Sequence, residues 1–158
     1  MMSQTSLKRD YDISEEIGRG KLGTVFKCRS CSTADSFAVK FIDKRSRKEW
    51  KEEAKILHHL SPHPHPHIIH LDNLWEDENH LHMVIDYCPN GDLFNFIVTN
   101  QIILSENQAR CLFNQLMQAI SHCHEYRVVH RDINPENVLL DSGYSVKMRF
   151  SYEKLHHI

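Results

Sequence analysis

The chain has 158 residues, 41% of them hydrophobic and 25% charged, which is enough to bury a core and close to the average for soluble globular proteins. A formal net charge of −2 gives no electrostatic reason to expect binding to nucleic acid or a membrane, and no apolar run approaches the roughly 18 residues of a membrane span. A polar N-terminus and five scattered cysteines indicate an intracellular protein, expected in the cytoplasm, with the nucleus as the alternative.

Alternation of apolar and polar residues predicts β-strands over the first half of the chain. We expect five of them, at residues 11–17, 24–29, 36–42, 68–75 and 80–87. Between the third and the fourth, Ala54, Leu57 and Leu60 recur at helical spacing, which predicts a helix over residues 44–60. Five strands with one helix predict an α+β fold for this part of the chain.

Residues 89–91, Pro-Asn-Gly, interrupt this pattern and indicate a boundary. A short helix is predicted over residues 92–98, and a longer amphipathic one over residues 105–126, where Ser105 and Gln108 have the spacing of a capping box. Two short strands are expected after it, at residues 138–140 and 145–148. The predicted organisation is a flexible N-terminus, two lobes and a divergent tail, at residues 1–10, 11–88, 89–147 and 148–158.

The first candidate functional segment has the pattern G-x-G-x-x-G-x-V over residues 18–25. Glycines allow a hairpin to lie close to phosphate oxygens, because no Cβ separates them from the backbone amides. Dinucleotide-binding folds share part of this pattern but continue into a helix, whereas residues 24–28 continue as a strand. A glycine-rich turn without a ligand is the alternative. The predicted phosphate-binding residues are Ile17, Gly18, Arg19, Gly20, Lys21, Leu22, Gly23, Thr24 and Val25.

Lys40 lies in an apolar strand, where an ammonium group is costly to bury unless an anion meets it. Glu53 lies on the inward side of the following predicted helix, three residues before Ile56 and four before Leu57. A Lys40–Glu53 pair would direct the ammonium group toward two phosphates of a nucleotide. A lysine that extends along the surface into solvent is the alternative.

These residues resemble the nucleotide-binding lobe of eukaryotic protein kinases. The resemblance implies a small lobe, with a five-stranded antiparallel sheet and one helix, followed by an incomplete and mainly helical large lobe. It also implies a hinge over residues 85–88, in which Ile85 is the gatekeeper and Asp86 and Cys88 lie along the adenine of ATP. The apolar residues that match those around the adenine are Val25, Ala38 and Leu139.

The most specific motif is His-Arg-Asp-Ile-Asn-Pro-Glu-Asn, at residues 130–137. Phosphoryl transfer needs an aspartate that orients the substrate hydroxyl and, five residues later, an asparagine that coordinates magnesium. By resemblance Asp132 is that base and Asn137 is that Mg2+ ligand, and the Pro-Glu-Asn ending is typical of serine/threonine kinases. Asn134 replaces the usual catalytic lysine, so we expect transfer to be slower by on the order of 10².

The resemblance ends near residue 147. Where the family has Asp-Phe-Gly, this chain has Arg149, Phe150 and Ser151, which align only with a one-residue deletion and put a cation in place of the metal-binding carboxylate. These features predict an altered or truncated C-terminus. The apolar face of the helix at residues 105–126 is then expected to be an exposed hydrophobic patch.

Two other patterns have a metal-binding interpretation. His63, His65 and His67 alternate, as imidazoles that bind zinc or copper can do, but a solvated loop is the favoured interpretation. Cys28 and Cys31 form a single C-x-x-C pair without the second pair that a zinc site needs.

Two functions are compatible with these observations. The first is a serine/threonine protein kinase that uses ATP and Mg2+ to phosphorylate protein hydroxyls and is impaired by truncation. The second is a non-catalytic, pseudokinase-like module that binds nucleotide or a protein partner. An incomplete gene product without a settled function is a third possibility. The expected partners are ATP and a protein substrate or protein partner, not nucleic acid or a membrane.

Overall fold

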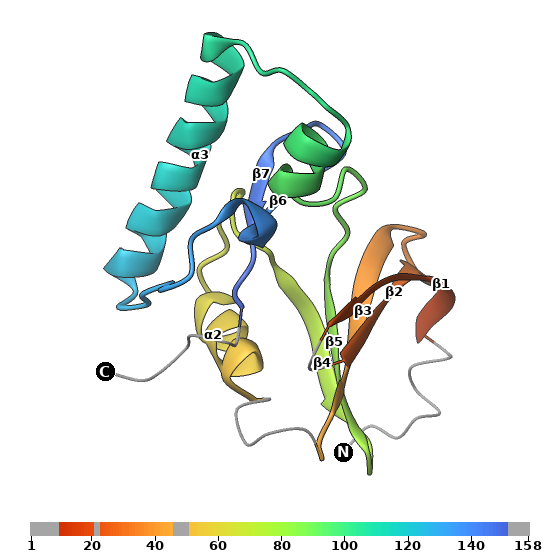
Figure 1. Ribbon diagram of the computed structural model, residues 1–158. Helices are drawn as coiled ribbons and strands as arrows, with labels where there is room; N and C mark the ends of the chain where they lie inside the picture. Colours follow the sequence, from red (N-terminus) through yellow and green to blue (C-terminus); the bar gives the residue numbers. More distant parts are fainter. Residues whose placement is uncertain (1–9, 21–22, 46–50, 152–158) are drawn as a thin grey trace. The chain divides into compact units, whose positions relative to one another are not determined.

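The computed structural model describes residues 10–20, 23–45 and 51–151 of the chain (Figure 1). It divides into two compact units, Met1–Ala54 with Leu71–Tyr87 and Lys55–His70 with Cys88–Ile158. No helix within the described ranges is long and apolar enough to cross a membrane. The segments expected at residues 1–10 and 148–158 fall mostly outside these ranges.

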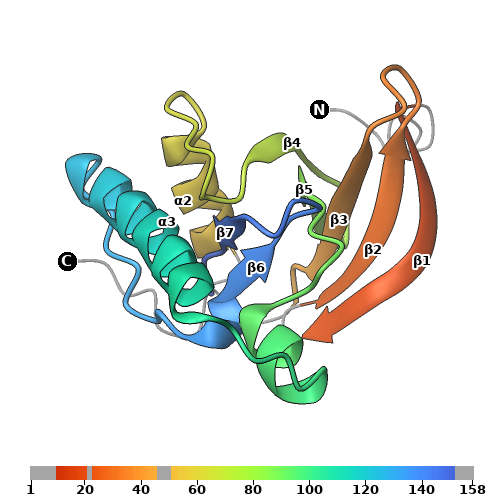
Figure 2. The same ribbon diagram turned by 90° about the horizontal axis from the view of Figure 1, so that it is seen from above.

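The first unit contains a five-stranded antiparallel sheet with the strand order β1-β2-β3-β5-β4 (Figure 2). Its strands are β1 (Tyr11–Gly20), β2 (Gly23–Ser30), β3 (Ser36–Asp43), β4 (Leu71–Glu76) and β5 (His80–Asp86). The sheet confirms the α+β fold. The predicted start of the fourth strand at residue 68 is wrong, because Ile68 and Ile69 pair with Met148 instead.

Aromatic packing holds one face of this sheet together. Tyr11 stacks on Trp75, with ring centroids 6.2 Å apart, and meets Phe37 edge to face. The Tyr11 hydroxyl donates a hydrogen bond of 2.7 Å to Asp72. Beneath these rings Cys28 is 1% exposed, and burial raises the pKa of its thiol to about 11. Cys28 is therefore part of the packed core of this sheet.

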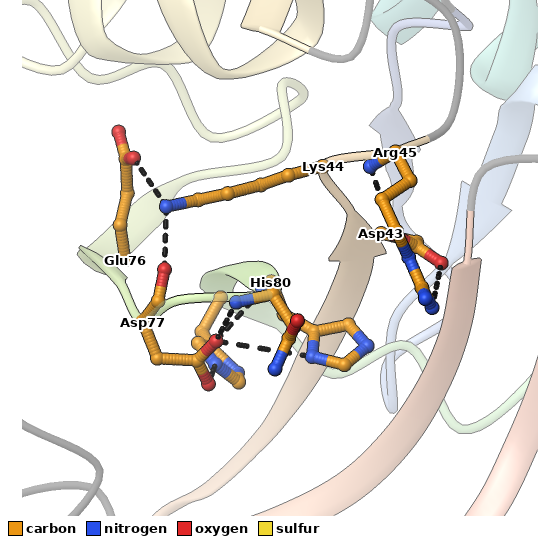
Figure 3. Close-up of polar contacts among 8 residues, drawn as sticks. Asp43, Lys44, Arg45, Glu76, Asp77 and His80 are labelled. Carbon is orange, nitrogen blue, oxygen red and sulfur yellow. Dashed lines mark hydrogen bonds and ion pairs between the residues drawn. The ribbon is translucent and has the colours of Figure 1, made fainter.

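The turn between β4 and β5 is built around Asp77 (Figure 3). One of its carboxylate oxygens accepts hydrogen bonds from the backbone amides of Asn79, at 2.8 Å, and His80, at 2.7 Å. The other oxygen lies 2.7 Å from Nε2 of the buried His82. Lys44 pairs with Glu76 at 2.8 Å and also donates to the backbone carbonyl of Asp77. These contacts fix the end of β3 beside the turn.

The contacts of Lys44 explain why the predicted helix over residues 44–60 begins later. Lys44 and Arg45 lie in a turn, where Arg45 pairs with Asp43 at 3.0 Å (Figure 3). The helix α2 spans Glu52–Leu60, and residues 46–50 lie outside the described ranges. The prediction is therefore wrong at Lys44, because its backbone amide donates to the carbonyl of Asn79 beside β5, at 2.9 Å, and so extends the sheet.

The second unit contains the long helix α3 (Glu106–Glu125) and a hairpin of β6 (Val138–Leu140) and β7 (Val146–Met148). Ser105 caps α3 as predicted: its Oγ accepts from the backbone amide of Gln108, whose side-chain oxygen accepts from the amide of Ser105. The side-chain oxygen of Gln115 on α3 accepts a 2.9 Å hydrogen bond from the amide of Val146 on β7. This contact joins α3 to the hairpin.

Two further features of this unit differ from a simple helical pattern. The short helix expected over residues 92–98 is instead a π-helix, Asn95–Thr99, preceded by helical residues 93–94. On α3, Phe113 is 60% exposed and Met117 44% exposed, whereas Ala119 and Cys123 are buried. Part of the apolar face of α3 is therefore open in the described structure.

Candidate functional site

The glycine-rich segment forms the hairpin between β1 and β2, with Gly20 opposite Gly23 and Gly18 opposite Val25. A Cβ on Gly23 would lie 1.8 Å from the carbonyl oxygen of Phe41, so β3 itself requires a glycine there. A Cβ on Gly18 or Gly20 would meet nothing within 4 Å. Packing therefore explains one of the three glycines, and the other two leave the hairpin backbone open to a ligand.

Other residues of the predicted phosphate loop lie around this hairpin. Arg19 makes two hydrogen bonds to Glu16, at 3.0 and 2.8 Å, which lower the pKa of that exposed carboxyl. Ile17 is 41% exposed, and Thr24 lies opposite Phe41 of β3. Lys21 and Leu22, also predicted here, lie outside the described residues.

Lys40 and Glu53 are brought together as predicted. Lys40 lies on β3, between Val25 of β2 and Met83 of β5. Its ammonium group forms an ion pair with the carboxylate of Glu53 on α2, and the two side chains are 19% and 6% exposed. A pair this deeply placed is held in one geometry, because separating it would leave a buried carboxylate without a counter-charge. The alternative of a solvent-extended lysine does not describe this contact.

The predicted adenine-contacting residues fall in both units. Val25 and Ala38 belong to the first, where Ala38 is 4% exposed and lies opposite the proposed gatekeeper Ile85. Asp86 lies opposite Phe37 at the end of β5. In the second unit, the carbonyl of Cys88 accepts from the amide of Gly91, whose φ of +68° favours glycine, and Leu139 forms an isolated bridge with Asp92.

Asp132 and Asn137 form the centre of the catalytic-loop motif. The side-chain amide of Asn137 donates to the backbone carbonyl of Asp132, at 2.8 Å, and to its carboxylate, at 2.9 Å. Asn137 is 4% exposed. Arg131, between the motif histidine and Asp132, has a φ of +62°, a strained conformation of the kind that clusters at functional sites. The loop therefore holds the Asp132 carboxylate in a defined orientation.

Asn134 has a local structural role that the motif comparison did not predict. Its side-chain oxygen accepts hydrogen bonds from the amides of Glu136, at 3.0 Å, and Asn137, at 3.2 Å, and so caps the short 3₁₀ helix Pro135–Asn137. An asparagine directly before a proline is a typical helix N-terminus, so this role could have been read from the sequence. The side-chain oxygen is thus committed to the fold of the loop.

His130, the first residue of the motif, also has contacts that sequence reasoning missed. Its Nε2 lies 2.7 Å from the backbone carbonyl of Arg149, and its ring stacks on Phe150 with centroids 5.0 Å apart. His130 is 3% exposed, and burial lowers its pKa although the Arg149 carbonyl and Asp132 act in the opposite direction. The neutral ring therefore fixes the segment after β7. No periodic or spacing signal in the sequence indicates this contact.

Within the described ranges, no cluster of three or more His, Cys, Asp or Glu side chains could hold a metal ion. The alternating histidines instead make ring contacts: His63 stacks on Tyr126 at 4.2 Å, and His65 lies 4.8 Å from His122. The Nε2 of His122 lies 2.8 Å from the carbonyl of His63. These contacts tie the loop to the C-terminal end of α3.

The fold and the ordered motifs define a member of the protein kinase family. The family model described as protein kinase domain matches residues 11–149, and this chain therefore belongs to that family.

Three individual protein kinases are similar to this chain over most of its length. Calcium-dependent protein kinase 22 of Arabidopsis thaliana is 37% identical over 86% of this chain, and human NUAK family SNF1-like kinase 2 is 35% identical over 96% of it. The calcium/calmodulin-dependent protein kinase type II alpha chain of Drosophila melanogaster is 35% identical over 91% of it. The matches cover 29%, 24% and 28% of these relatives, so the chain spans about a quarter of their length.

Proposed function

We propose that this chain is an ATP-binding serine/threonine protein kinase domain, in which Asp132 orients a protein hydroxyl and accepts its proton during transfer of the γ-phosphoryl group. The observation that carries the proposal is the double hydrogen bond from the Asn137 amide to the carbonyl and carboxylate of Asp132. A base must be held within hydrogen-bond reach of the proton that it takes, and this contact restricts the carboxylate.

The proposed nucleotide-binding residues come from the open hairpin and the buried ion pair. The hairpin offers backbone amides at Gly18 and Gly20, and Glu53 directs the Lys40 ammonium group toward phosphate oxygens. The remaining proposed contacts to ATP are Ile17, Arg19, Lys21, Leu22, Gly23, Thr24, Val25, Ala38, Asp86, Cys88 and Leu139.

Protein kinases as a family use ATP with Mg2+, and Asn137 is the residue that would contribute to a metal site here. Asn134 supplies no positive charge, and its side-chain oxygen is occupied as a helix cap. Electrostatic stabilisation of the transferring phosphoryl group is therefore weaker than with a lysine. We expect a transfer rate lower by on the order of 10², judged from the loss of comparable donors.

The test is incorporation of labelled phosphate from ATP into a generic serine- and threonine-containing acceptor protein. Asp132→Asn keeps the size of the side chain but removes its basicity, and should abolish incorporation. Asp35→Asn, the same substitution in an exposed turn, should leave incorporation unchanged. Undiminished incorporation by the Asp132→Asn variant would contradict the role of Asp132.

A second function, a non-catalytic nucleotide-binding or protein-interaction module, is favoured by one specific contact. The side chain of Arg149 lies against Asn137, where a metal-binding carboxylate would be expected. A chain of this kind would gain thermal stability with ATP but would incorporate no phosphate into the acceptor. Both measurements on the same preparation therefore separate the two functions.

A further inference from the structure

Arg149 is held in place through its backbone, directly after β7. Its amide donates a 3.0 Å hydrogen bond to the carbonyl of Asn137, and its carbonyl lies 2.7 Å from Nε2 of His130. The next residue, Phe150, is 2% exposed and stacks on the His130 ring. Because both peptide groups and the following side chain are fixed, the position of Arg149 beside the catalytic loop belongs to the fold.

The side chain of Arg149 is hydrogen-bonded to the Asn137 oxygen that would coordinate a metal ion. Its Nε donates to the side-chain oxygen of Asn137 at 3.3 Å. The amide nitrogen of the same asparagine donates to Asp132, so both ends of the Asn137 amide are engaged. Mg2+ requires oxygen ligands in near-octahedral geometry, usually with one or two carboxylates. An amide oxygen that faces a guanidinium group does not fit that requirement.

The guanidinium group of Arg149 has further N–H donors that could bind an anion. Arg149 is exposed, and among the described residues its Nε is the side-chain atom that donates a hydrogen bond. Across the part of the chain that the structure describes, no carboxylate lies within ion-pair distance of it, so within these residues its two terminal nitrogen atoms have no carboxylate partner. The planar arrangement of these donors matches two oxygens of one phosphate group.

We propose that Arg149 replaces the divalent cation in this chain, and that its guanidinium group binds the phosphate oxygens of a nucleoside triphosphate, so that the nucleotide binds without magnesium. The proposal rests on the proposed function as an ATP-binding chain. It assigns Asn137 a different task from that of a metal ligand. Its oxygen orients Arg149, and its amide nitrogen orients Asp132.

The first test compares ATP binding to the full chain in EDTA and in excess magnesium, by isothermal titration calorimetry. Binding in EDTA should be at least as tight as with magnesium, because free ATP presents the charge that a guanidinium group recognises. Binding that appears only with magnesium would overturn the proposal and leave the proposed function intact. No binding in either buffer would overturn the proposed function and this inference with it.

Variants of Arg149 give the second test. Arg149→Gln should weaken ATP binding in EDTA by about tenfold or more, the range expected for a charge-assisted hydrogen-bonded pair. Arg110→Gln removes the same charge from an exposed position on α3, where it pairs with Glu106, and should change the affinity less than about twofold. Equal affinities of the Arg149→Gln variant and the wild-type chain would overturn the proposal.

Arg149→Asp places a carboxylate beside the oxygen of Asn137 and should make ATP binding dependent on magnesium. The same nucleotide affinity with and without magnesium in this variant would also overturn the proposal. Thermal unfolding without nucleotide serves as the folding control for every variant. The comparison of the two buffers on the unmodified chain needs no variant at all.

Discussion

Gly23 and Gly20 face each other across one hairpin, yet their substitution by alanine should have different consequences. A Cβ on Gly23 would lie 1.8 Å from the Phe41 carbonyl oxygen, and its other close neighbours are also backbone atoms of β3. Backbone cannot move aside as a flexible side chain does, so the end of β2 must separate from β3 by more than about 1 Å, given a strand spacing of about 4.8 Å.

The expected loss combines two contributions. Overpacking of this kind costs about 1–3 kcal/mol, and one ladder hydrogen bond lost near Gly23 and Thr24 adds about 1 kcal/mol. We therefore expect Gly23→Ala to lower the free energy of unfolding by about 3 kcal/mol and the melting temperature by about 6–12 °C. Gly20→Ala and Gly18→Ala meet no neighbour within 4 Å. They should leave stability unchanged or raise it by about 0.4–1 kcal/mol, because alanine restricts the unfolded chain.

The assay is urea denaturation followed by tryptophan fluorescence, since the buried Trp75 lies in the same sheet. ATP affinity, measured on the same variants, should show the reverse order, because Gly20 is the position proposed to approach phosphate. Equal destabilisation by Gly20→Ala and Gly23→Ala would refute the distinction between a packing glycine and a ligand-facing glycine.

Three further predictions concern the ion pair, the buried histidines and the cap of α3. Lys40→Met leaves the buried Glu53 carboxylate unpaired, and should lower the free energy of unfolding in urea by about 2–3 kcal/mol. Burial holds the pKa of His82 and of His130 below the ordinary value, so below pH 6.5 the unfolded chain binds protons that the folded chain does not. Stability measured in urea should therefore fall as the pH is lowered through about 6.5, by up to about 1.4 kcal/mol per pH unit for each histidine. Ser105→Ala should lower the free energy of unfolding by about 1 kcal/mol, because an amide at the start of α3 loses its acceptor.

Each of these predictions has an outcome that would contradict it. Adding Glu53→Gln to Lys40→Met should restore at least half of the lost stability, and no recovery would mean that the unpaired carboxylate is not the cause. A stability profile that stays flat between about pH 7.5 and 5.5 would mean that the two histidines take up protons in the folded state. A Ser105→Ala variant as stable as the wild type would exclude the cap as a significant contribution.

The sequence predicted the sheet well because alternation survives in every strand that has one buried face. The predictions were wrong where contacts between distant residues determine the bounds or the type of an element. Ile68 and Ile69 look like the start of a strand, but they pair with Met148, about 80 residues later in the chain, and no local pattern reports such pairing. Lys44 fits a helix by propensity, yet its backbone amide donates to the carbonyl of Asn79 and its ammonium group pairs with Glu76. The π-helix at Asn95–Thr99 could not be predicted from a periodicity of 3.6 residues per turn, which is that of an α-helix.

For the candidate site, the order of the motifs gave the candidate residues, and the structure adds the contacts between them. The Lys40–Glu53 pair was predictable, because a buried ammonium group needs a carboxylate and the helix offers one on its inward side. The contact of Arg149 with Asn137 was not predictable. It depends on the direction in which the chain leaves β7, which places Arg149 beside Asn137. The sequence alone could say that a carboxylate is replaced, but not where the guanidinium group is directed.

The cap formed by Asn134 has a consequence for any attempt to restore a conventional kinase loop. Asn134→Lys would introduce the missing charge, but it would also deprive the amide of Glu136 of its acceptor, whereas the amide of Asn137 would keep the backbone carbonyl of Asn134, at 3.0 Å. A lysine side chain donates hydrogen bonds but cannot accept one, so it cannot replace the cap that Asn134 provides to Glu136. The substitution would therefore add the charge at the expense of one hydrogen bond in the turn, unless a neighbouring side chain accepts from the Glu136 amide.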